Sequence, residues 1–242
     1  MPALTSASPA KNRLALALDV SGADEARRML DRVGDEVGII KIGYQLAFSG
    51  GMDLIRELSH AGKSVFADLK LLDIDNTMAH GIRSVAALGA TFLTIHAYPK
   101  AMRTAVDTLG DDHALTVLGV TVLTSMDDTD LSEAGYAGST QSLVRLRATQ
   151  AQQAGMPGLV CSAREVPLLR ELAGSDMLLV TPGIRFADDG ASDQKRIVTP
   201  DRAIADGADI LVMGRPITGS GDPRSAARRA VEAIEAGLEV RA

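Results

Sequence analysis

Eight short apolar segments, each followed by a segment with helical spacing, constrain the fold of this chain more than any other feature. The segments are uniformly apolar, a pattern typical of parallel strands that are covered on both faces of a sheet. Eight strand–helix units in 242 residues predict an α/β fold, a closed (β/α)8 TIM barrel. The expected strands are residues 14–19, 37–43, 64–69, 91–96, 115–123, 158–161, 177–181 and 209–213.

The segments between these strands carry apolar residues at helical spacing. The expected helices are residues 23–33, 44–61, 76–88, 100–109, 140–153, 162–173, 200–206 and 223–238. Residues 127–138 are expected to form a loop. Asp75 and Asn76 are candidate N-caps for the third helix, and Ser162 and Glu165 have the spacing of a capping box.

An open, doubly wound sheet is the alternative fold. That fold favours a glycine-rich G-x-G-x-x-G turn after its first strand. The chain instead reads D-V-S-G-A-D-E after Leu18, which favours the closed barrel. No linker or break in composition divides the chain. We therefore expect a disordered tail at residues 1–12 and one barrel domain at residues 13–242.

Charge and composition exclude several classes of function. The net charge of −6 argues against a general binder of nucleic acid or anionic membranes. No apolar stretch approaches the ~18 residues that a membrane span needs, and the first dozen residues lack the pattern of a signal peptide. The single cysteine, Cys161, excludes an internal disulfide and suits a reducing compartment, so a cytoplasmic location is expected.

Polar residues stand where the predicted strands end. In an α/β barrel the carboxyl ends of the strands share one face, and that face holds the active site. Stability alone does not readily explain many polar groups on one rim, although His96 suits a structural role equally well. The residues expected to meet there are Asp19, Lys41, Asp68, Lys70, His96, Thr124, Ser125, Arg185, Gly214 and Arg215.

The stretch D-L-K-L-L-D at residues 68–73 carries the expected chemistry. Together with Lys41, its residues Asp68, Lys70 and Asp73 form a quartet of ammonium and carboxylate groups that alternate in charge. Flanking carboxylates keep a lysine protonated, and such a lysine stabilises a nearby carbanion and then donates a proton to it. The structural alternative is an ion-pair network that closes a strand end, which is less favoured for so long a pattern.

The loops after the last two strands predict a phosphate site. They read T-P-G-I-R at 181–185 and V-M-G-R-P at 212–216, and the corresponding loops of α/β barrels often bind phosphate. Arg185, Gly214 and Arg215 are the candidate ligands, although each motif by itself is also typical of an ordinary loop.

Two further polar groups are candidates for the edge of a small ring. Thr124 and Ser125 end the fifth strand, where they either bind a ring or cap a turn. Gln194 offers an amide in the loop after the seventh strand. The remaining histidines have no partners at metal-ligand spacing, so no metal site is expected.

With these residues in place, the chain closely resembles the orotidine 5′-phosphate decarboxylase family of the bacterial type. The resemblance rests on A-L-D-V at 17–20, D-L-K-L-L-D-I-D-N-T at 68–77 and V-T-V-L-T-S-M at 120–126. It continues through V-C-S-A-R-E, V-T-P-G-I-R, D-Q-K-R-I-V-T-P and G-R-P-I-T, in the family's order, over nearly the whole chain. The family's fold is the (β/α)8 barrel.

The resemblance implies decarboxylation of orotidine 5′-monophosphate to uridine 5′-monophosphate (UMP), the last step of de novo pyrimidine biosynthesis, with no metal and no organic cofactor. It implies that Lys70 protonates C6 and that Asp68 lies against the leaving carboxylate. It also implies a homodimer in which Asp73 serves the partner's site.

The remaining roles that the resemblance implies concern substrate contacts. Asp19 and Lys41 would hold the ribose, and Thr124 and Ser125 the pyrimidine. Arg185, Gly214 and Arg215 would bind phosphate, with Gln194 between ring and phosphate, and Ile74 and Thr77 would line the neighbouring site. The chain departs from the family at Asp75, where proline is common, and at Leu71 and Leu72, where aromatic residues or histidine are common.

Two other classes compete with this interpretation. Sugar-phosphate barrels, such as hexulose-phosphate synthases, share D-x-K-x-x-D but need magnesium; the L-T-S-M and D-Q-K-R stretches argue against them. A catalytically silent phosphate-binding barrel would not need Lys70, and the chain retains all four charged positions.

Overall fold

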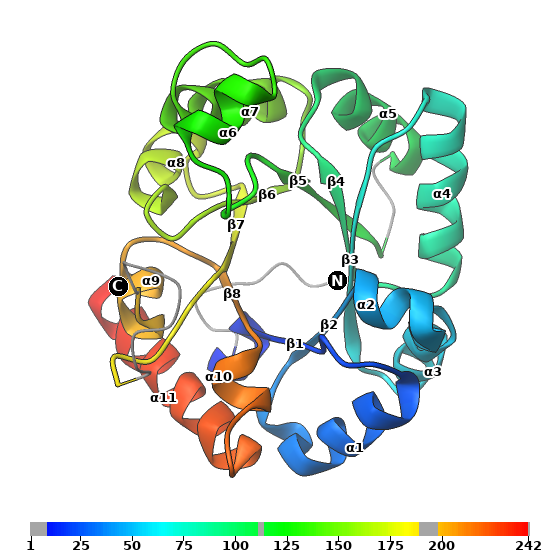
Figure 1. Ribbon diagram of the computed structural model, residues 1–242, viewed down its shortest axis with the longest axis vertical. Helices are drawn as coiled ribbons and strands as arrows, with labels where there is room; N and C mark the ends of the chain where they lie inside the picture. The colour runs from blue at the N-terminus through cyan, green and yellow to red at the C-terminus, as the bar shows by residue number, and fades with distance from the viewer. Residues whose placement is uncertain (1–8, 111–113, 189–197, 242) are drawn as a thin grey trace.

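The computed structural model describes residues 9–110, 114–188 and 198–241, and its strands close into a barrel (Figure 1). All neighbouring strands are parallel and follow chain order, and β8 pairs with β1 to complete the circle. The predicted (β/α)8 barrel is therefore confirmed, and the open sheet is excluded. The strands are β1 (Leu14–Ala17), β2 (Ile39–Gly43), β3 (Ser64–Leu71), β4 (Phe92–His96), β5 (Thr116–Val120), β6 (Gly158–Val160), β7 (Leu178–Pro182) and β8 (Ile210–Met213).

Helices surround the barrel (Figure 1). They are α1 (Ala23–Val33), α2 (Tyr44–Leu46), α3 (Met52–His60), α4 (Asp75–Ala87), α5 (Pro99–Leu109), α6 (Asp128–Glu133), α7 (Thr140–Gln153), α8 (Val166–Ala173), α9 (Pro200–Ala205), α10 (Arg215–Thr218) and α11 (Pro223–Arg241). In the described part of the chain, no helix combines the length and the hydropathy that crossing a membrane requires.

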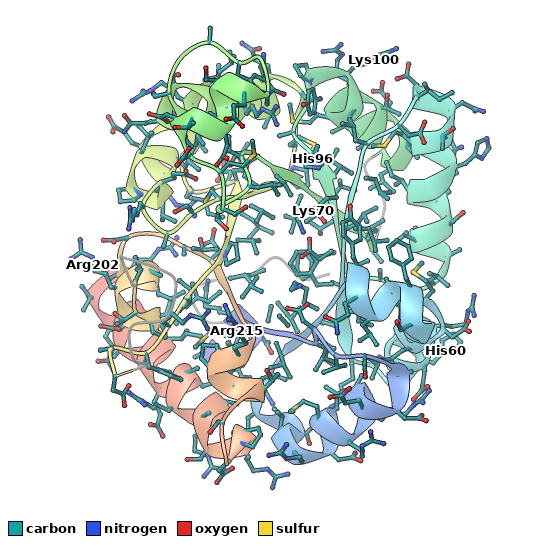
Figure 2. The ribbon with its side chains drawn as sticks, viewed as in Figure 1. His60, Lys70, His96, Lys100, Arg202 and Arg215 are labelled. Atoms are coloured by element: carbon teal, nitrogen blue, oxygen red, sulfur yellow. The ribbon has the colours of Figure 1, made fainter. Side chains whose placement is uncertain are left out.

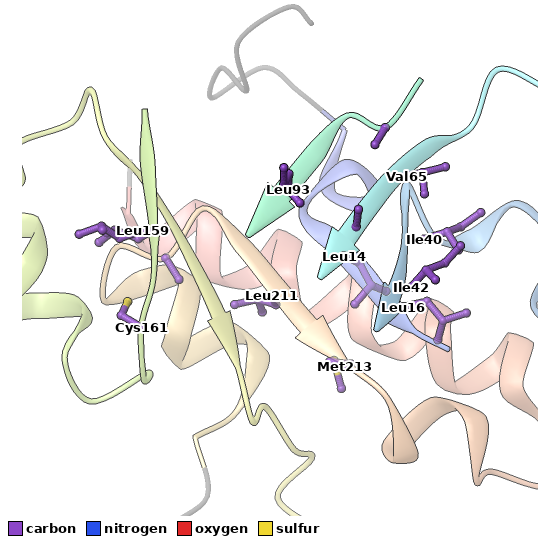
Figure 3. Close-up of a cluster of buried hydrophobic side chains, with 14 of the residues drawn as sticks. Leu14, Leu16, Ile40, Ile42, Val65, Leu93, Leu159, Cys161, Leu211 and Met213 are labelled. Atoms are coloured by element: carbon purple, nitrogen blue, oxygen red, sulfur yellow. The ribbon is translucent and has the colours of Figure 1, made fainter. Parts of the chain in front are cut away.

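The strands separate two apolar cores, which explains why they are uniformly apolar. Alternate residues of one strand point to opposite faces. In β1, Leu14 and Leu16 face the helices, where they join the large outer core (Figure 3). Ala15 and Ala17 face the barrel axis and pack with Phe66, Phe92 and other residues of a smaller inner core. Each strand must therefore be apolar on both faces over most of its length.

The single helix predicted over residues 44–61 is wrong. The structure has α2, then a π-helical segment at Ala47–Gly51, then α3. Gly50 has φ 93°, in the left-handed region that glycine adopts readily, and Ser49 also departs from helical geometry. A Cβ on Gly51 would lie 2.5 Å from the carbonyl oxygen of Leu46, so the close approach of the two helical segments requires glycine there.

Two short helices were missed, α6 and α10. Asp127 caps α6, since its carboxylate accepts hydrogen bonds from the N–H groups of Thr129 and Asp130. The Asp130 carboxylate in turn accepts the N–H of Asp127 at 2.8 Å, which completes a capping box. Residues 127–138 are therefore partly helical.

The predicted caps of α4 are also wrong. The helix begins at Asp75, its N-cap is Ile74, and no side chain caps it. The Asp75 carboxylate instead pairs with Lys100 of α5 at 2.9 Å. Negative charge in a first helical turn is favourable even without a capping hydrogen bond. The predicted Ser162–Glu165 pair is present in part, because the Glu165 carboxylate accepts the Ser162 N–H at 2.9 Å, but α8 begins only at Val166.

The ordered chain begins before residue 13. Residues 1–8 of the predicted tail lie outside the described residues, whereas Ala10–Arg13 form a 3-10 helix in which Ala10 is buried. The carbonyl of Lys11 accepts the N–H of Gly38 at 2.8 Å, which ties this turn to the start of β2.

A buried carboxylate ties the amino-terminal ends of the strands together. Asp209, just before β8, accepts hydrogen bonds from Arg170 of α8 at 2.6 Å, Arg241 of α11 at 3.1 Å and the N–H of Leu179 at 2.9 Å. Arg13 lies 4.0 Å from the same carboxylate. Positions at this end of a barrel serve stability.

We expect Asp209→Ala to lower the free energy of unfolding by about 3–5 kcal/mol, because removing this buried carboxylate leaves the buried Arg13 and the half-buried Arg170 and Arg241 without their counter-charge. Asp206→Ala is the matched control. Asp206 pairs with the exposed Arg202, and such surface pairs contribute about 1 kcal/mol or less. Denaturant unfolding of both variants measures the difference, and equal losses would contradict the assigned role of Asp209.

Candidate active site

A cavity of about 300 Å³ opens at the carboxyl ends of the strands. Its lining comes from seven of the eight strands or the loops that follow them. Figure 2 shows Lys70 and Arg215 within the ring of helices, and His60 on the outer edge of the molecule. The predicted site residues that line this cavity are Asp19, Lys41, Asp68, Lys70, Thr124, Arg185, Gly214 and Arg215.

The polar lining continues the inward face of the strands. Ile39 and Phe66 belong to the inner core, and the next inward positions on their strands are Lys41 and Asp68. The same step of two residues leads from Ala17, the last residue of β1, to Asp19 in the segment that follows it. The apolar layer thus forms the floor of the cavity, and the charged residues lie one layer above it.

Four charged groups of one chain form a row of alternating sign. Asp68 is at its centre, with its Oδ1 2.7 Å from Lys70 Nζ and its Oδ2 3.2 Å from Lys41 Nζ. Lys41 Nζ also lies 3.6 Å from Asp19 Oδ1. Lys41 is buried, whereas the side chain of Asp19 is more than half exposed. The contacts predicted among Lys41, Asp68 and Lys70 are therefore present.

Asp68 is held in its ionised form. Burial raises the pKa of this carboxyl group, but the ammonium groups of Lys41 and Lys70 and the hydroxyl of Thr94 outweigh burial, so that the net pKa lies below its usual value. The Asp68 carboxylate, one layer above the floor of the cavity, therefore stays negative at neutral pH.

The backbone is irregular where Asp68 and Lys70 stand. Ala67 of β3 pairs with Leu93 of β4, and Leu71 pairs with Ile95. Three residues of β3 therefore lie opposite the single residue Thr94, which makes a bulge. Lys70 has φ 42°, and no other non-glycine residue in the described ranges has positive φ. Such strained conformations occur preferentially at functional sites. The simple alternation expected for a regular strand does not describe these residues.

Asp73 does not join the charged row of its own chain. It is exposed, and its carboxylate accepts the N–H of Ile74 at 2.6 Å. Ile74 and Thr77 are also exposed and do not line the cavity. Within one described chain, the fourth member of the row is Asp19 instead.

The opposite side of the cavity carries the glycine and arginine residues of the last two loops. Gly183 has φ 82°, and a Cβ on Gly214 would lie 3.3 Å from that of Ala17, so both positions favour glycine. Arg185 is half-buried and Arg215 exposed. Ser125 is exposed next to the cavity-lining Thr124. Gln194 lies outside the described residues.

A buried arginine supports the loop after β5, and sequence analysis missed it. Arg147 of α7 donates to the carbonyl of Thr121 at 2.9 Å and stacks on the ring of Tyr98 at 4.4 Å. It also donates to the hydroxyl of Tyr136 at 3.1 Å. Burial, followed by the positive charges of Arg147 and Lys70, lowers the pKa of nearby His96. No sequence pattern marks this cluster, because its members are distant in the chain.

The fold and the site define a (β/α)8-barrel protein whose pocket combines a lysine–aspartate row with two arginines. The family model described as "Orotidine 5'-phosphate decarboxylase / HUMPS family" matches residues 12–230, and the chain belongs to this family.

Similar proteins carry the first of these two names. An orotidine 5′-phosphate decarboxylase of Rhodopseudomonas palustris (strain BisB5) is 54% identical over 232 residues, covering 96% of this chain and 98% of the relative. One from Methylobacterium sp. (strain 4-46) is 52% identical over 228 residues, covering 93% and 96%. The crystal structure of orotidine 5′-phosphate decarboxylase from Lactobacillus acidophilus superimposes with a TM-score of 0.81 at 34% identity, covering 91% of this chain and 98% of that one.

Proposed function

We propose that this protein is a carboxy-lyase that converts orotidine 5′-monophosphate to UMP and CO2, the last step of de novo pyrimidine biosynthesis. The observation that carries the proposal is the row Lys41–Asp68–Lys70 in the lining of the cavity. Full-length relatives named for this activity, at more than 50% identity, support the same conclusion.

The two sides of the cavity suit the two ends of the substrate. The phosphate would lie against Arg185, Gly214 and Arg215, because guanidinium groups and backbone N–H groups are good partners for it. The ribose hydroxyls would bind Asp19 and Lys41, which are already within ion-pair distance of each other. The remaining proposed contacts are those of the pyrimidine with Thr124 and Ser125, and of Gln194 between ring and phosphate.

The charged row suits a reaction that develops negative charge on carbon. When the bond between C6 and the carboxylate breaks, CO2 leaves and the electron pair stays on C6. The Lys70 ammonium group would stabilise this pair and then donate a proton to C6, which yields UMP and neutral lysine; solvent then returns the proton to lysine. Asp68 would lie beside the substrate carboxylate, where like charge favours the departure of CO2.

The proposed chemistry needs no metal and no organic cofactor, since a lysine ammonium group supplies both the positive charge and the proton. Among the described residues, no three His, Cys, Asp or Glu side chains come together as a potential metal site. Activity after chelation tests whether the enzyme works without a metal ion.

We also propose a homodimer in which Asp73 acts in the partner's site, with Ile74 and Thr77 beside it. Large apolar side chains lie exposed around this segment. Phe48 stacks on Tyr44 at 5.7 Å, and the Tyr44 hydroxyl donates to the carbonyl of Leu69. Leu72 and Ile74 follow directly and are 49% and 72% exposed. An apolar patch next to a functional loop is typical of a protein interface.

Two sequence-based expectations stay predictions. One is that residues 13–242 are a single barrel domain; of the disordered tail predicted at residues 1–12, residues 10–12 instead belong to a 3-10 helix and residues 1–8 lie outside the described residues. The other is the cytoplasmic location, which rests on the single cysteine and on the pathway proposed here.

Lys70→Ala is expected to lower turnover of orotidine 5′-monophosphate by about a thousandfold or more. Losing about 4 kcal/mol, the energy of one charge contact at ~4 Å in an effective dielectric near 20, corresponds to roughly that factor. Lys63→Ala, which removes an exposed lysine paired with Asp35, is the matched control and should retain activity. A loss of less than tenfold in Lys70→Ala would remove this lysine from the mechanism.

Mixing inactive Lys70→Ala with inactive Asp73→Ala should restore about a quarter of wild-type activity, since half of randomly exchanged dimers are mixed and each mixed dimer holds one intact site. The control is a mixture of Lys70→Ala with Lys41→Ala. Both lysines contact Asp68 of their own chain, so no subunit exchange brings them together intact. If subunits exchange and the first mixture stays inactive, Asp73 does not act in the partner's site.

Exhaustive chelation should leave the rate of orotidine 5′-monophosphate turnover unchanged. This measurement separates the proposed activity from that of the magnesium-dependent sugar-phosphate barrels. A loss of activity that added Mg²⁺ restores would contradict the cofactor-independent mechanism. Binding of UMP without any turnover of orotidine 5′-monophosphate would instead favour a silent phosphate-binding barrel.

A further inference from the structure

Thr94 lies beneath the charged row without reaching the cavity. It is on β4, two residues beyond the inner-core residue Phe92, and it is fully buried. It does not belong to the cavity lining. In the β3–β4 ladder it falls between Leu93 and Ile95, opposite the bulge that carries Asp68 and Lys70.

The Thr94 hydroxyl joins the backbone of one charged residue to the side chain of the other. Its Oγ1 accepts the backbone N–H of Lys70 at 2.9 Å. It lies 2.9 Å from Asp68 Oδ1, to which it donates its proton. Since Asp68 Oδ1 also accepts from Lys70 Nζ at 2.7 Å, the contacts form a closed loop from the Lys70 backbone through Thr94 and Asp68 to the Lys70 ammonium group.

This loop accounts for the irregular backbone. In the bulge, the Lys70 N–H is turned out of the regular ladder, and a buried N–H without a partner costs about 1–3 kcal/mol. Thr94 supplies that partner while Lys70 stays at φ 42°. A left-handed conformation at a residue other than glycine persists when its surroundings over-determine it.

We infer that Thr94 is a positioning residue for the decarboxylation: its hydroxyl fixes the Lys70 backbone and the Asp68 carboxylate so that the ammonium group points to one place in the cavity. The inference rests on the proposed function. Thr94 does not touch the substrate and acts only through its two neighbours.

The choice of side chain at position 94 tests this role. Thr94→Val keeps the shape and removes the hydroxyl, whereas Thr94→Ser keeps the hydroxyl. Thr121→Val is the matched control, because it removes a buried hydroxyl that donates to a neutral partner, the carbonyl of Val160, at 3.1 Å. All three variants are compared with the wild type by kcat, KM and the pH dependence of kcat for orotidine 5′-monophosphate.

We expect Thr94→Val to lower kcat by about tenfold to a hundredfold, the factor that corresponds to losing a hydrogen bond to a charged group. KM should change less than threefold, and Thr94→Ser and Thr121→Val should stay within about threefold of wild type. Asp68 faces Lys41, Lys70 and Thr94. With one donor lost its pKa should rise, so the acidic limb of the kcat profile should move to higher pH.

A crystal structure of Thr94→Val separates this inference from the proposed function. We expect Lys70 to leave positive φ, or its Nζ to move beyond ion-pair distance of Asp68. If wild type has no activity, the proposed function fails and this structure alone decides the positioning role. If wild type is active but Thr94→Val matches Thr121→Val in kcat and keeps the Lys70 geometry, the inference is overturned.

Discussion

The contact on which the site depends is the carboxylate of Asp68 held between two ammonium groups. A buried carboxylate alone would tend to take up a proton, because burial by itself raises its pKa. Together, Lys41 and Lys70 keep Asp68 ionised, and each of its two carboxylate oxygens holds one ammonium group. The charges therefore stand in place before any substrate arrives, and preorganised charge of this kind lowers the barrier to a reaction that builds up charge.

The two ends of the barrel have different roles: one end stabilises the fold, and the other holds the charged row. The inner apolar layer of Phe66, Phe92 and their neighbours seals the axis below the charged row. At the far end, Asp209 gathers arginines from the first residues and from the last helix. Contacts far from the cavity thus stabilise the closed barrel. The strand ends above the apolar layer can therefore carry strained and charged residues.

Sequence patterns predicted the strands and most charged positions because those signals are local. Apolar runs mark the strands, and a charge directly after an apolar run marks a strand end. The patterns failed where distant contacts decide the structure. The π-helical segment after α2 depends on the approach of Gly51 to Leu46, and the roles of Thr94 and Arg147 depend on partners more than twenty residues away. Threonine is also common in β-strands, so the sequence alone does not distinguish Thr94 from other strand residues; its role depends on the bulge opposite it.

The polar residues near the site fall into two groups, those that are paired within one chain and those that are exposed. Lys41, Asp68 and Lys70 find their partners within one chain and are largely covered by it. Asp73 and Ile74, a few residues further on, remain exposed. The stacked rings of Tyr44 and Phe48 are also exposed, and Tyr44 is tied to β3 by its hydrogen bond to the Leu69 carbonyl. In an isolated subunit the apolar side chain of Ile74 remains in contact with water, which is unfavourable. In the proposed homodimer, a second copy would cover this segment, bring another carboxylate toward Lys70 and shield the row from water, which would strengthen every charge contact within it.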